Sequence, residues 1–237
     1  MIDLTRWKLT TPHPGTDGLA VEVLNLVGYN LSPYFVQRPG GTLQFDAPVD
    51  GAKTKGTKYA RSELREMNGG KPAAWTLKQG GTLKATCRVL SAPRCKDGSA
   101  GKMVTGQIHG KTDELCRLYW DNGTMYFVSD ISGTDHREHT WHLYDAFGNV
   151  PKVAIGEEFS YKIFAHGKHM VVQVYADGTW YRCDLATDPL WQKDTLYFKA
   201  GVYLGVNSDV DANGKPTHGG ATGSGSVEFS ALEYSHP

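Results

Sequence analysis

The sequence lacks the features that mark several classes of protein. It has no apolar run of about 18 residues, so we expect no membrane-spanning segment. Neither charge is in excess, because 25 lysines and arginines balance 25 aspartates and glutamates. This balance argues against a general affinity for nucleic acids or membranes, although a local basic groove stays open as a possibility. The N-terminus has no charged-then-apolar signal segment, so the chain is expected to be cytosolic or already processed.

Helical periodicity is also scarce, whereas glycine is abundant, with 28 residues, and aromatic residues make up 11% of the chain. This combination favours short strands joined by turns. The 237 residues fit one large all-β domain or two small ones. No linker, internal repeat or change in composition divides the chain, so we predict a single domain over residues 1–237.

Cysteine is sparse, and its spacing includes no Cys-x-x-Cys pair, which argues against a zinc site. Four cysteines allow three sets of disulfides, and the sequence cannot choose among them. Cys87 and Cys95 flank a short break at 91–93 and are the favoured pair if the protein is oxidised. Free thiols at all four positions, which also include Cys116 and Cys183, are an equal alternative.

The stretch 197–203, Tyr-Phe-Lys-Ala-Gly-Val-Tyr, has an unusual polar face if it forms a strand, because side chains then alternate between two faces. One face is apolar and can enter a core: Phe198, Ala200 and Val202. The other face carries an ammonium group and two phenols: Tyr197, Lys199, Gly201 and Tyr203. Glycine in a strand often marks the close approach of a ligand or of another backbone. We therefore interpret this second face as part of a site.

Two further stretches gather polar groups on one face in the same way. In 61–65, Arg-Ser-Glu-Leu-Arg, that face holds Arg61, Glu63 and Arg65. In 107–109, Gln-Ile-His, the side chains of Gln107 and His109 share a face, and the residue between them points into the core. Three faces that are rich in groups able to bind or move charge indicate one common site.

Many short strands with regular turns predict a sandwich or a barrel. A two-sheet antiparallel β-jelly roll fits best, because the polar strand faces then line a concave substrate cleft. An edge strand is expected over 3–10, and a long loop over 207–226 is a candidate lid. The other expected strands are 34–36, 42–47, 61–65, 82–90, 103–109, 115–120, 124–129, 159–165, 170–175, 179–183, 197–203 and 227–234.

With these three stretches in order along the chain, the sequence resembles polysaccharide lyase family 7, the jelly-roll alginate lyases. The opening Trp-Lys-Leu-Thr of residues 7–10 also resembles the first strand of that family, so the resemblance spans nearly the whole chain. One departure is that Leu204 and Gly205 follow Tyr203, where the family often has asparagine and glutamine. Position 205 shares the face of Tyr203, so a contact with the substrate is expected to be missing there.

The resemblance implies β-elimination of alginate, a polymer of mannuronate and guluronate, with endolytic action and a 4,5-unsaturated uronate at the non-reducing end of the product. It implies a catalytic set of four residues: Arg61, Gln107, His109 and Tyr203. It also implies four residues that bind substrate or support the site: Glu63, Arg65, Lys199 and Tyr197. In this family, isoleucine between glutamine and histidine tends to accompany acceptance of guluronate, and Ile108 is that residue here.

The residues fit this chemistry on physical grounds as well. Removing the C5 proton of a uronate places charge on the adjacent carboxylate, which Arg61 and Gln107 could neutralise as preorganised donors. His109, with an ordinary pKa of about 6.5, can act as a base near neutral pH. Tyr203, with an ordinary pKa of about 10, is suited to protonate the leaving oxygen, and nearby cations would help it to ionise and act as a base too. This reaction needs no metal or other cofactor.

Some of these residues allow other interpretations. His136, His139 and His142 repeat every three residues, but strand alternation puts His139 opposite the other two, and the segment has the composition of an exposed loop. Glu63 and Glu66 are not a glycosidase pair, because their odd spacing puts them on opposite faces of a strand. A non-catalytic carbohydrate-binding jelly roll would not need His109 or Tyr203, and a lyase of another polyuronate, such as glucuronan, would use the same residues.

The expected partner is therefore an anionic polysaccharide, with no nucleic acid and no membrane. We further expect a monomer that is secreted or periplasmic.

Overall fold

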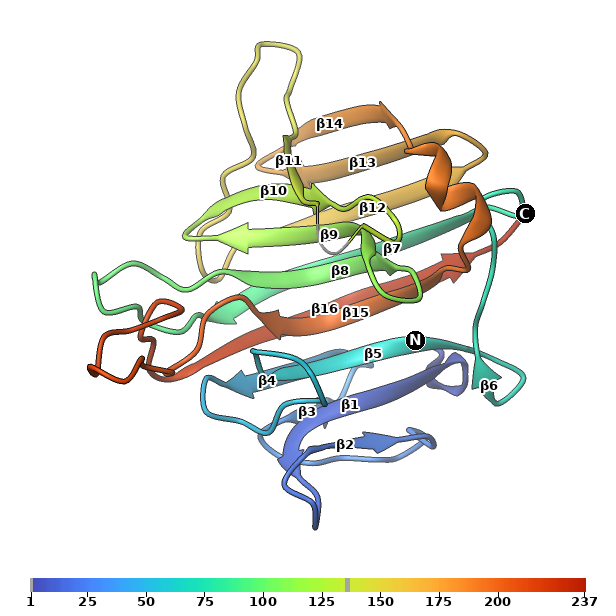
Figure 1. The fold of residues 1–237 in the computed structure, drawn as a ribbon. Coiled ribbons are helices and arrows are strands. Elements are labelled where there is room, and N and C mark those ends of the chain that lie inside the picture. Colours follow the sequence, from blue (N-terminus) through green and yellow to red (C-terminus); the bar gives the residue numbers. More distant parts are fainter. Residues whose placement is uncertain (1, 135–136) are drawn as a thin grey trace.

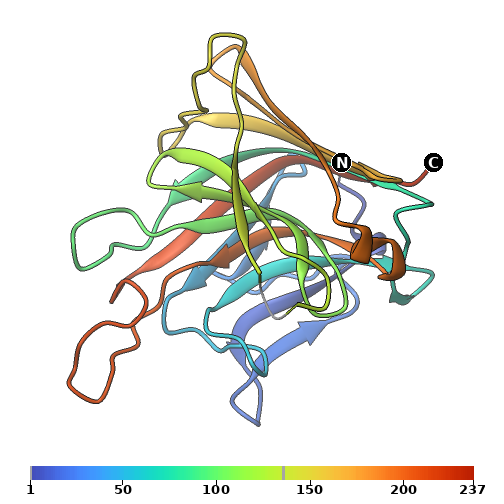
Figure 2. The same ribbon diagram turned by 45° about the horizontal axis from the view of Figure 1, so that its top comes forward.

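The strands form two antiparallel sheets stacked face to face, as the alternation of polar and apolar residues predicts. The computed structural model describes residues 2–134 and 137–237. Figure 1 shows them as two curved layers, and Figure 2 shows the same layers with the top turned forward. No helix of these residues is long and apolar enough to cross a membrane. The predicted all-β, two-sheet antiparallel fold is confirmed.

The first sheet has nine strands and the second has seven. The first runs in the order β11 (His139–His142), β10 (Thr124–Ser129), β9 (Glu114–Asp121), β8 (Met103–His109), β15 (Tyr197–Leu204), β5 (Arg61–Asn68), β1 (Trp7–Pro14) and β2 (Ala20–Val23), with β6 (Lys71–Pro72) beside β5. The second runs in the order β14 (Thr179–Ala186), β13 (His169–Ala176), β12 (Glu158–His166), β7 (Gly81–Ser91), β16 (Ser224–Ser235), β4 (Leu43–Pro48) and β3 (Phe35–Gln37). Two short 3-10 helices are η1 (Leu4–Arg6) and η2 (Pro189–Lys193).

The opening strand is not at an edge, contrary to the sequence prediction. β1 lies between β5 and β2, because the short strand β2 returns beside it. The register between β1 and β2 shifts between Thr11 and Pro14. Such an irregularity accommodates proline, which has no N–H to donate to a neighbouring strand. This inner position places Thr10 opposite Glu63 on β5, one of the three strands that carry the polar motifs.

The core lies between the sheets and fixes the direction of the polar faces. The apolar face of β15 is fully buried, with Phe198, Ala200 and Val202 all 0% exposed. Below β8, the Tyr161 hydroxyl of the second sheet donates to the Thr105 carbonyl at 3.0 Å. Its ring packs where Gly106 has no side chain, since a Cβ at 106 would lie 2.7 Å from the Tyr161 oxygen. The second sheet thereby supports the strand that carries the Gln-Ile-His motif.

Gly201 marks the close approach of a neighbouring backbone. Its φ of 143° lies in a region that favours glycine, and a Cβ there would lie 2.5 Å from the carbonyl oxygen of Ser62 on β5. A side chain at 201 would therefore push β5 away from β15. The glycine keeps two of the three polar motifs on adjacent strands.

Two details of the sequence analysis need correction. The four cysteines, Cys87, Cys95, Cys116 and Cys183, are free thiols, so the favoured bond between Cys87 and Cys95 is not formed. Residues 139–142, expected in a loop, form β11 because they pair with β10. His136 lies outside the described residues.

Candidate active site

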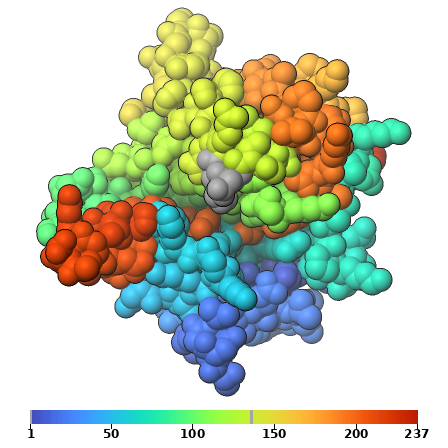
Figure 3. Space-filling view, viewed as in Figure 1, coloured from blue at the N-terminus to red at the C-terminus, as the bar shows by residue number. Residues whose placement is uncertain are grey.

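A cleft crosses the exposed face of the first sheet and contains most of the residues that the sequence analysis selected. Figure 3 shows the face as a surface with a hollow near its middle. The cleft has a volume of about 740 Å³. Six of the predicted residues line it: Arg61, Arg65, His109, Tyr197, Lys199 and Tyr203. The other two, Glu63 and Gln107, lie beneath its surface and are 1% and 0% exposed.

The strand register brings the three motifs together, because β15 lies between β8 and β5. Tyr197 is opposite His109 on β8, and Tyr203 is opposite Arg61 on β5. Lys199, between them, is opposite Gln107 on one side and Arg65 on the other. Directly opposite side chains on one face of a sheet are in contact range, so the three motifs form one surface.

Glu63 is the hub of the charges beneath the cleft. Its two oxygens accept hydrogen bonds from the Gln107 amide and the Lys199 ammonium, and Arg61 Nη1 lies 3.4 Å from Oε2. A carboxylate that is 1% exposed and shared among three donors has no room to contact a substrate. Of the two roles expected for Glu63, the structure favours support of the site.

Aromatic rings order the cations and the histidine. The Arg61 guanidinium lies 3.9 Å from the centre of the Tyr203 ring, and that of Arg65 lies 3.8 Å from the Tyr197 ring. His109 stacks on the same Tyr197 ring that Arg65 contacts. The His109 and Tyr197 ring centres are 5.0 Å apart, and the interplanar angle is 12°. Such cation–π and stacking contacts hold long side chains in one orientation before a substrate arrives.

The surroundings set different protonation states for the two candidate proton-transfer groups. Burial, reinforced by the Lys199 ammonium, lowers the pKa of His109 to about 3, so its imidazole is neutral. Burial raises the pKa of Tyr203, although Arg61 acts in the opposite direction. The expectation that nearby cations would promote ionisation of Tyr203 is therefore outweighed by burial. At neutral pH the Tyr203 phenol therefore carries its proton, and the neutral His109 imidazole has a free lone pair.

Lys199 is a buried cation whose pKa depends on its neighbours. Burial and the neighbouring Arg61 lower the pKa of Lys199 to about 8, whereas Glu63 acts to raise it. Its Nζ lies 5.9 Å from the centre of the Tyr203 ring. The ammonium thus stays charged at neutral pH largely because Glu63 lies beside it.

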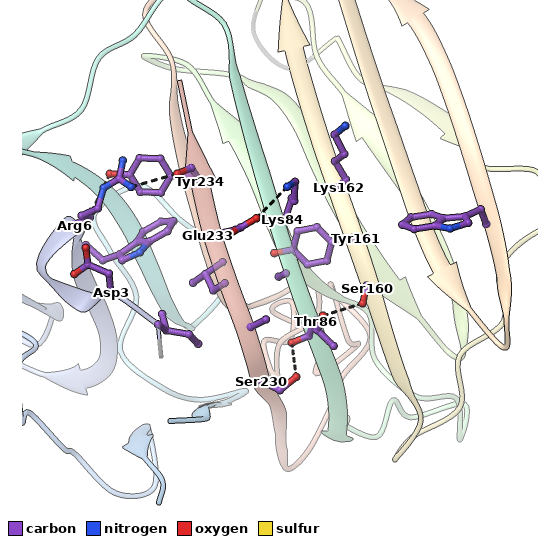
Figure 4. Close-up of a pocket in the computed structure, with 16 residues that line it drawn as sticks. Asp3, Arg6, Lys84, Thr86, Ser160, Tyr161, Lys162, Ser230, Glu233 and Tyr234 are labelled. Carbon is purple, nitrogen blue, oxygen red and sulfur yellow. Dashed lines mark hydrogen bonds and ion pairs between the residues drawn. The ribbon is translucent and has the colours of Figure 1, made fainter. Parts of the chain in front are cut away.

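A second hollow, on the outer face of the second sheet, contains none of the three motifs (Figure 4). It has a volume of about 540 Å³. Two pairs of its polar groups contact each other, as Lys84 pairs with Glu233 at 3.0 Å and the hydroxyl groups of Thr86 and Ser160 lie 2.9 Å apart. The groups that could move a proton or bind an anion are concentrated in the cleft of the first sheet instead.

The structure also separates the two carboxylates that could suggest a glycosidase. Glu66 faces away from Glu63 and accepts hydrogen bonds from the Trp75 indole at 3.0 Å and the Phe198 N–H at 2.9 Å. Its other oxygen lies 2.7 Å from His236. The prediction that Glu63 and Glu66 lie on opposite faces of the strand, and so do not form a glycosidase pair, is confirmed. Among residues 2–134 and 137–237, no cluster of three or more histidine, cysteine or acidic side chains could hold a metal ion.

The sequence analysis missed Lys102, which lines the cleft just before β8. Its alkyl chain lies over Gly205, because a Cβ at 205 would be 2.7 Å from Lys102 Cγ. Its Nζ lies 5.3 Å from the centre of the Tyr119 ring. Strict alternation from Gln107 would turn residue 102 toward the core, but the register of β8 against β9 shifts between Val104 and Gly106. Lys102 thus occupies the space left by the absent side chain at 205.

We expect Lys102→Ala to weaken substrate binding without impairing the chemical step. An ammonium group at the rim of a cleft adds uniform binding to a polyanion, so KM should rise several-fold while kcat changes little. Steady-state kinetics at low and high salt check this, since screening should reduce the difference from wild type. A large fall in kcat with unchanged KM would place Lys102 at the reacting sugar instead.

Comparisons with known proteins agree with the geometry of the cleft. The family model described as alginate lyase matches residues 2–236. An alginate lyase from Klebsiella pneumoniae is 30% identical over 268 aligned positions, covering 90% of this chain and 84% of the relative. The crystal structure of an alginate lyase from Klebsiella pneumoniae superposes with a TM-score of 0.84 at 26% identity, covering 100% of this chain and 97% of that one.

Two further solved structures have the same fold. Alginate lyase PA1167 from Pseudomonas aeruginosa has a TM-score of 0.71 and 26% identity, with 100% of both chains covered. A double variant of the family 7 lyase A1-II′, solved in complex with the substrate GGMG, has a TM-score of 0.76 and 24% identity, with 99% of this chain and 94% of that chain covered. The match of the family model along almost the entire sequence agrees with the three motifs assembled in the cleft. The chain therefore belongs to the alginate lyases of polysaccharide lyase family 7.

Proposed function

We propose that this alginate lyase cleaves its polymer by β-elimination in the cleft of the first sheet, with His109 as base and Tyr203 as acid. The observation that carries the proposal is that the charge of one cation, Arg61, acts on both groups. Arg61 contacts the ring of Tyr203, and its charge acts on the pKa of both Tyr203 and His109. A uronate carboxylate bound at Arg61 would therefore have a proton acceptor and a proton donor within the same site.

Carboxylate neutralisation is the step that lowers the barrier most, because the C5 proton becomes acidic only when charge can move onto the carboxylate. Arg61 and Lys199 line the cleft and offer positive charge at its floor. Gln107 lies below them, and Glu63 fixes all three groups in position. Preorganised donors of this kind each contribute about 3–4 kcal/mol to stabilising a developing oxyanion. Arg65, held over Tyr197, is a further cation for a neighbouring sugar.

Proton transfer then follows from the protonation states. The C5–H bond breaks as neutral His109 takes the proton, the electron pair forms the C4–C5 double bond, and the C4–O4 bond breaks. The Tyr203 hydroxyl gives its proton to O4 of the leaving chain. The product has a 4,5-unsaturated uronate at its non-reducing end. The expected roles of Arg61, His109 and Tyr203 are retained in this proposal, whereas Gln107, which is 0% exposed and donates its amide to Glu63, supports the site from below.

The proposal extends to how the chain acts on the polymer. The residues that line the cleft come from six strands that are adjacent in the sheet, in the order β9, β8, β15, β5, β1 and β2. Because neighbouring strands lie about 4.8 Å apart, the cleft is about 24 Å long. A groove of this length accommodates several sugars of a long chain and supports endolytic action. We further propose that the protein acts as a monomer and is secreted or periplasmic, where an extracellular polysaccharide is accessible.

His109→Ala tests the assignment of the base. Guluronate needs base and acid on opposite faces of the sugar, whereas mannuronate can react with Tyr203 alone. We expect kcat/KM on guluronate blocks to fall by about 10²–10⁴-fold and to fall less on mannuronate blocks. Ultraviolet absorbance of the unsaturated product measures both, and glucuronan in a parallel assay tests the alternative polymer. Equal proportional losses on the two block types would contradict separate base and acid residues.

A further inference from the structure

Glu114, a residue outside the three motifs, lies directly against the candidate base. It begins β9 and is opposite His109 in the register of β8 and β9. Its Oε1 lies 3.4 Å from His109 Nε2, and its side chain is 12% exposed. Glu114 also lines the cleft. A carboxylate in this position must influence where the histidine keeps its proton.

The hydrogen bonds of His109 identify the nitrogen that faces Glu114. Nδ1 lies 2.7 Å from the carbonyl oxygen of Gly110, which can only accept a hydrogen bond, so Nδ1 carries the hydrogen. The lone pair of the neutral imidazole is therefore on Nε2, the nitrogen next to Glu114. A lone pair and an ionised carboxylate repel each other, so this contact is attractive only when one proton lies between the two groups.

The other charged groups around this pair come from four elements. Arg117 on β9 approaches Glu114 with Nε 3.8 Å from Oε2, too far for a hydrogen bond, and Asp130 after β10 accepts the Glu114 backbone N–H at 3.5 Å. Lys199 on β15 acts on both members of the pair, and Arg61 and Arg65 on β5 act on His109. Burial raises the pKa of Glu114 to about 7, although Arg117 opposes the shift. Glu114 thus changes its charge near neutral pH.

His109 surrounded only by cations would be a poor base. Burial and Lys199 lower its pKa to about 3, whereas a general base works best with a pKa near the operating pH. An ionised carboxylate in contact with the ring acts in the opposite direction, because it stabilises the imidazolium that forms when the proton arrives. Glu114 is the acidic side chain in contact with His109 Nε2.

We propose that Glu114 and His109 accept the C5 proton as a pair, with Glu114 ionised to stabilise the imidazolium. This inference rests on the proposed role of His109 as base. The C5 proton moves to Nε2 while the electron pair of the C5–H bond forms the C4–C5 double bond, and Tyr203 protonates the departing O4. The contact of 3.4 Å is longer than a charge-assisted hydrogen bond, so an ionised Glu114 leaves the lone pair available to the substrate. Glu114 is a positioning residue in this scheme, because it acts through His109.

The pH dependence of activity gives a sharp test. Below the pKa of Glu114, the protonated carboxyl group donates its hydrogen to the Nε2 lone pair of His109, which then cannot accept the C5 proton. We therefore expect kcat to rise as pH increases through about 7. Glu114→Gln cannot ionise, so we expect this ascending limb to disappear and kcat to fall by about 10²-fold, with little change in KM. Glu138→Gln is the matched control, because Glu138 lies 2.6 Å from Arg117 Nη2 but does not contact His109. It should keep the limb at the position of wild type.

The outcomes separate this inference from the proposed function. If His109→Ala keeps its activity on guluronate blocks, the role of His109 as base is wrong. If His109→Ala is inactive while Glu114→Gln keeps both kcat and the ascending limb, only the pairing is wrong.

A readout on the wild-type protein covers the case in which Glu114→Gln does not fold. The ¹⁵N resonance of His109 Nε2 should shift with a midpoint that matches the ascending limb of the activity. A resonance that stays constant from mildly acidic to mildly alkaline pH would overturn the proposal.

Discussion

Tyr203→Phe should abolish turnover while leaving the fold intact. The substitution removes only the hydroxyl group that donates a proton to O4. The ring keeps its contact with the Arg61 guanidinium at 3.9 Å and its edge contact with Tyr59 at 6.1 Å between ring centres. Because burial raises the pKa of Tyr203, the phenol is protonated at neutral pH and no ionised form is lost from the resting enzyme.

We expect kcat on alginate to fall by about 10³-fold or more, within the range that general acid catalysis contributes. Initial rates of unsaturated product formation measure the loss, and the thermal unfolding midpoint checks the fold. Tyr126→Phe is a suitable control, because its hydroxyl bonds to Asp121 at 2.9 Å and the residue does not line the cleft. Near-normal activity of Tyr203→Phe would assign protonation of the leaving group to another residue.

The strand bounds could be predicted closely because alternation and turn residues are local signals. β8 and β10 have the predicted bounds, Met103–His109 and Thr124–Ser129. The turn between β9 and β10 has Asn122 and Gly123 at φ values of 46° and 84°, as an Asn-Gly hairpin requires. The short strands β2, β6 and β11 were not predicted, although β3, which is also short, was expected over 34–36 and lies at Phe35–Gln37.

Site residues that share a face within one strand could be predicted from the sequence. Contacts between residues on neighbouring strands could not. The polar faces of β5, β8 and β15 follow from alternation within each motif. By contrast, the contact between His109 and Glu114 depends on a register shift between Ile108 and His109, which no local pattern encodes. The bulge at Val104 and Gly106 hid Lys102 in the same way. Pairing between distant strands is set by packing of the whole sheet.

Removing Glu63 should have the other large effect, because Glu63 accounts for the charge state of the cleft floor. Its carboxylate contacts Lys199 and Arg61, two cations that are themselves 5% and 8% exposed. Removing one partner of a buried ion pair leaves an uncompensated charge, which costs about 3–5 kcal/mol of unfolding free energy. Urea denaturation of Glu63→Ala should show a loss of this order.

Glu63→Gln tests the electrostatic role with little change of shape. Glu63 acts to raise the pKa of Lys199, which is about 8, so that pKa should fall when the carboxylate becomes an amide. Lysine is charged below its pKa and loses its charge as pH rises through that value. In the variant, Lys199 should therefore lose its charge at a lower pH than in wild type. We expect KM at neutral pH to increase and kcat to fall by about 10²-fold or more, since one preorganised donor contributes about 3–4 kcal/mol.

A drop in pH should partly restore the binding of alginate by Glu63→Gln, because it returns the proton to Lys199. Glu66→Gln is the control for loss of a buried carboxylate from the same strand, because Glu66 faces Trp75 and His236 rather than the cleft. It should lower stability without this shift in the pH dependence of KM. If KM of Glu63→Gln follows pH as wild type does, Glu63 orients Gln107 and the cations by geometry alone, and Lys199 keeps its proton without it.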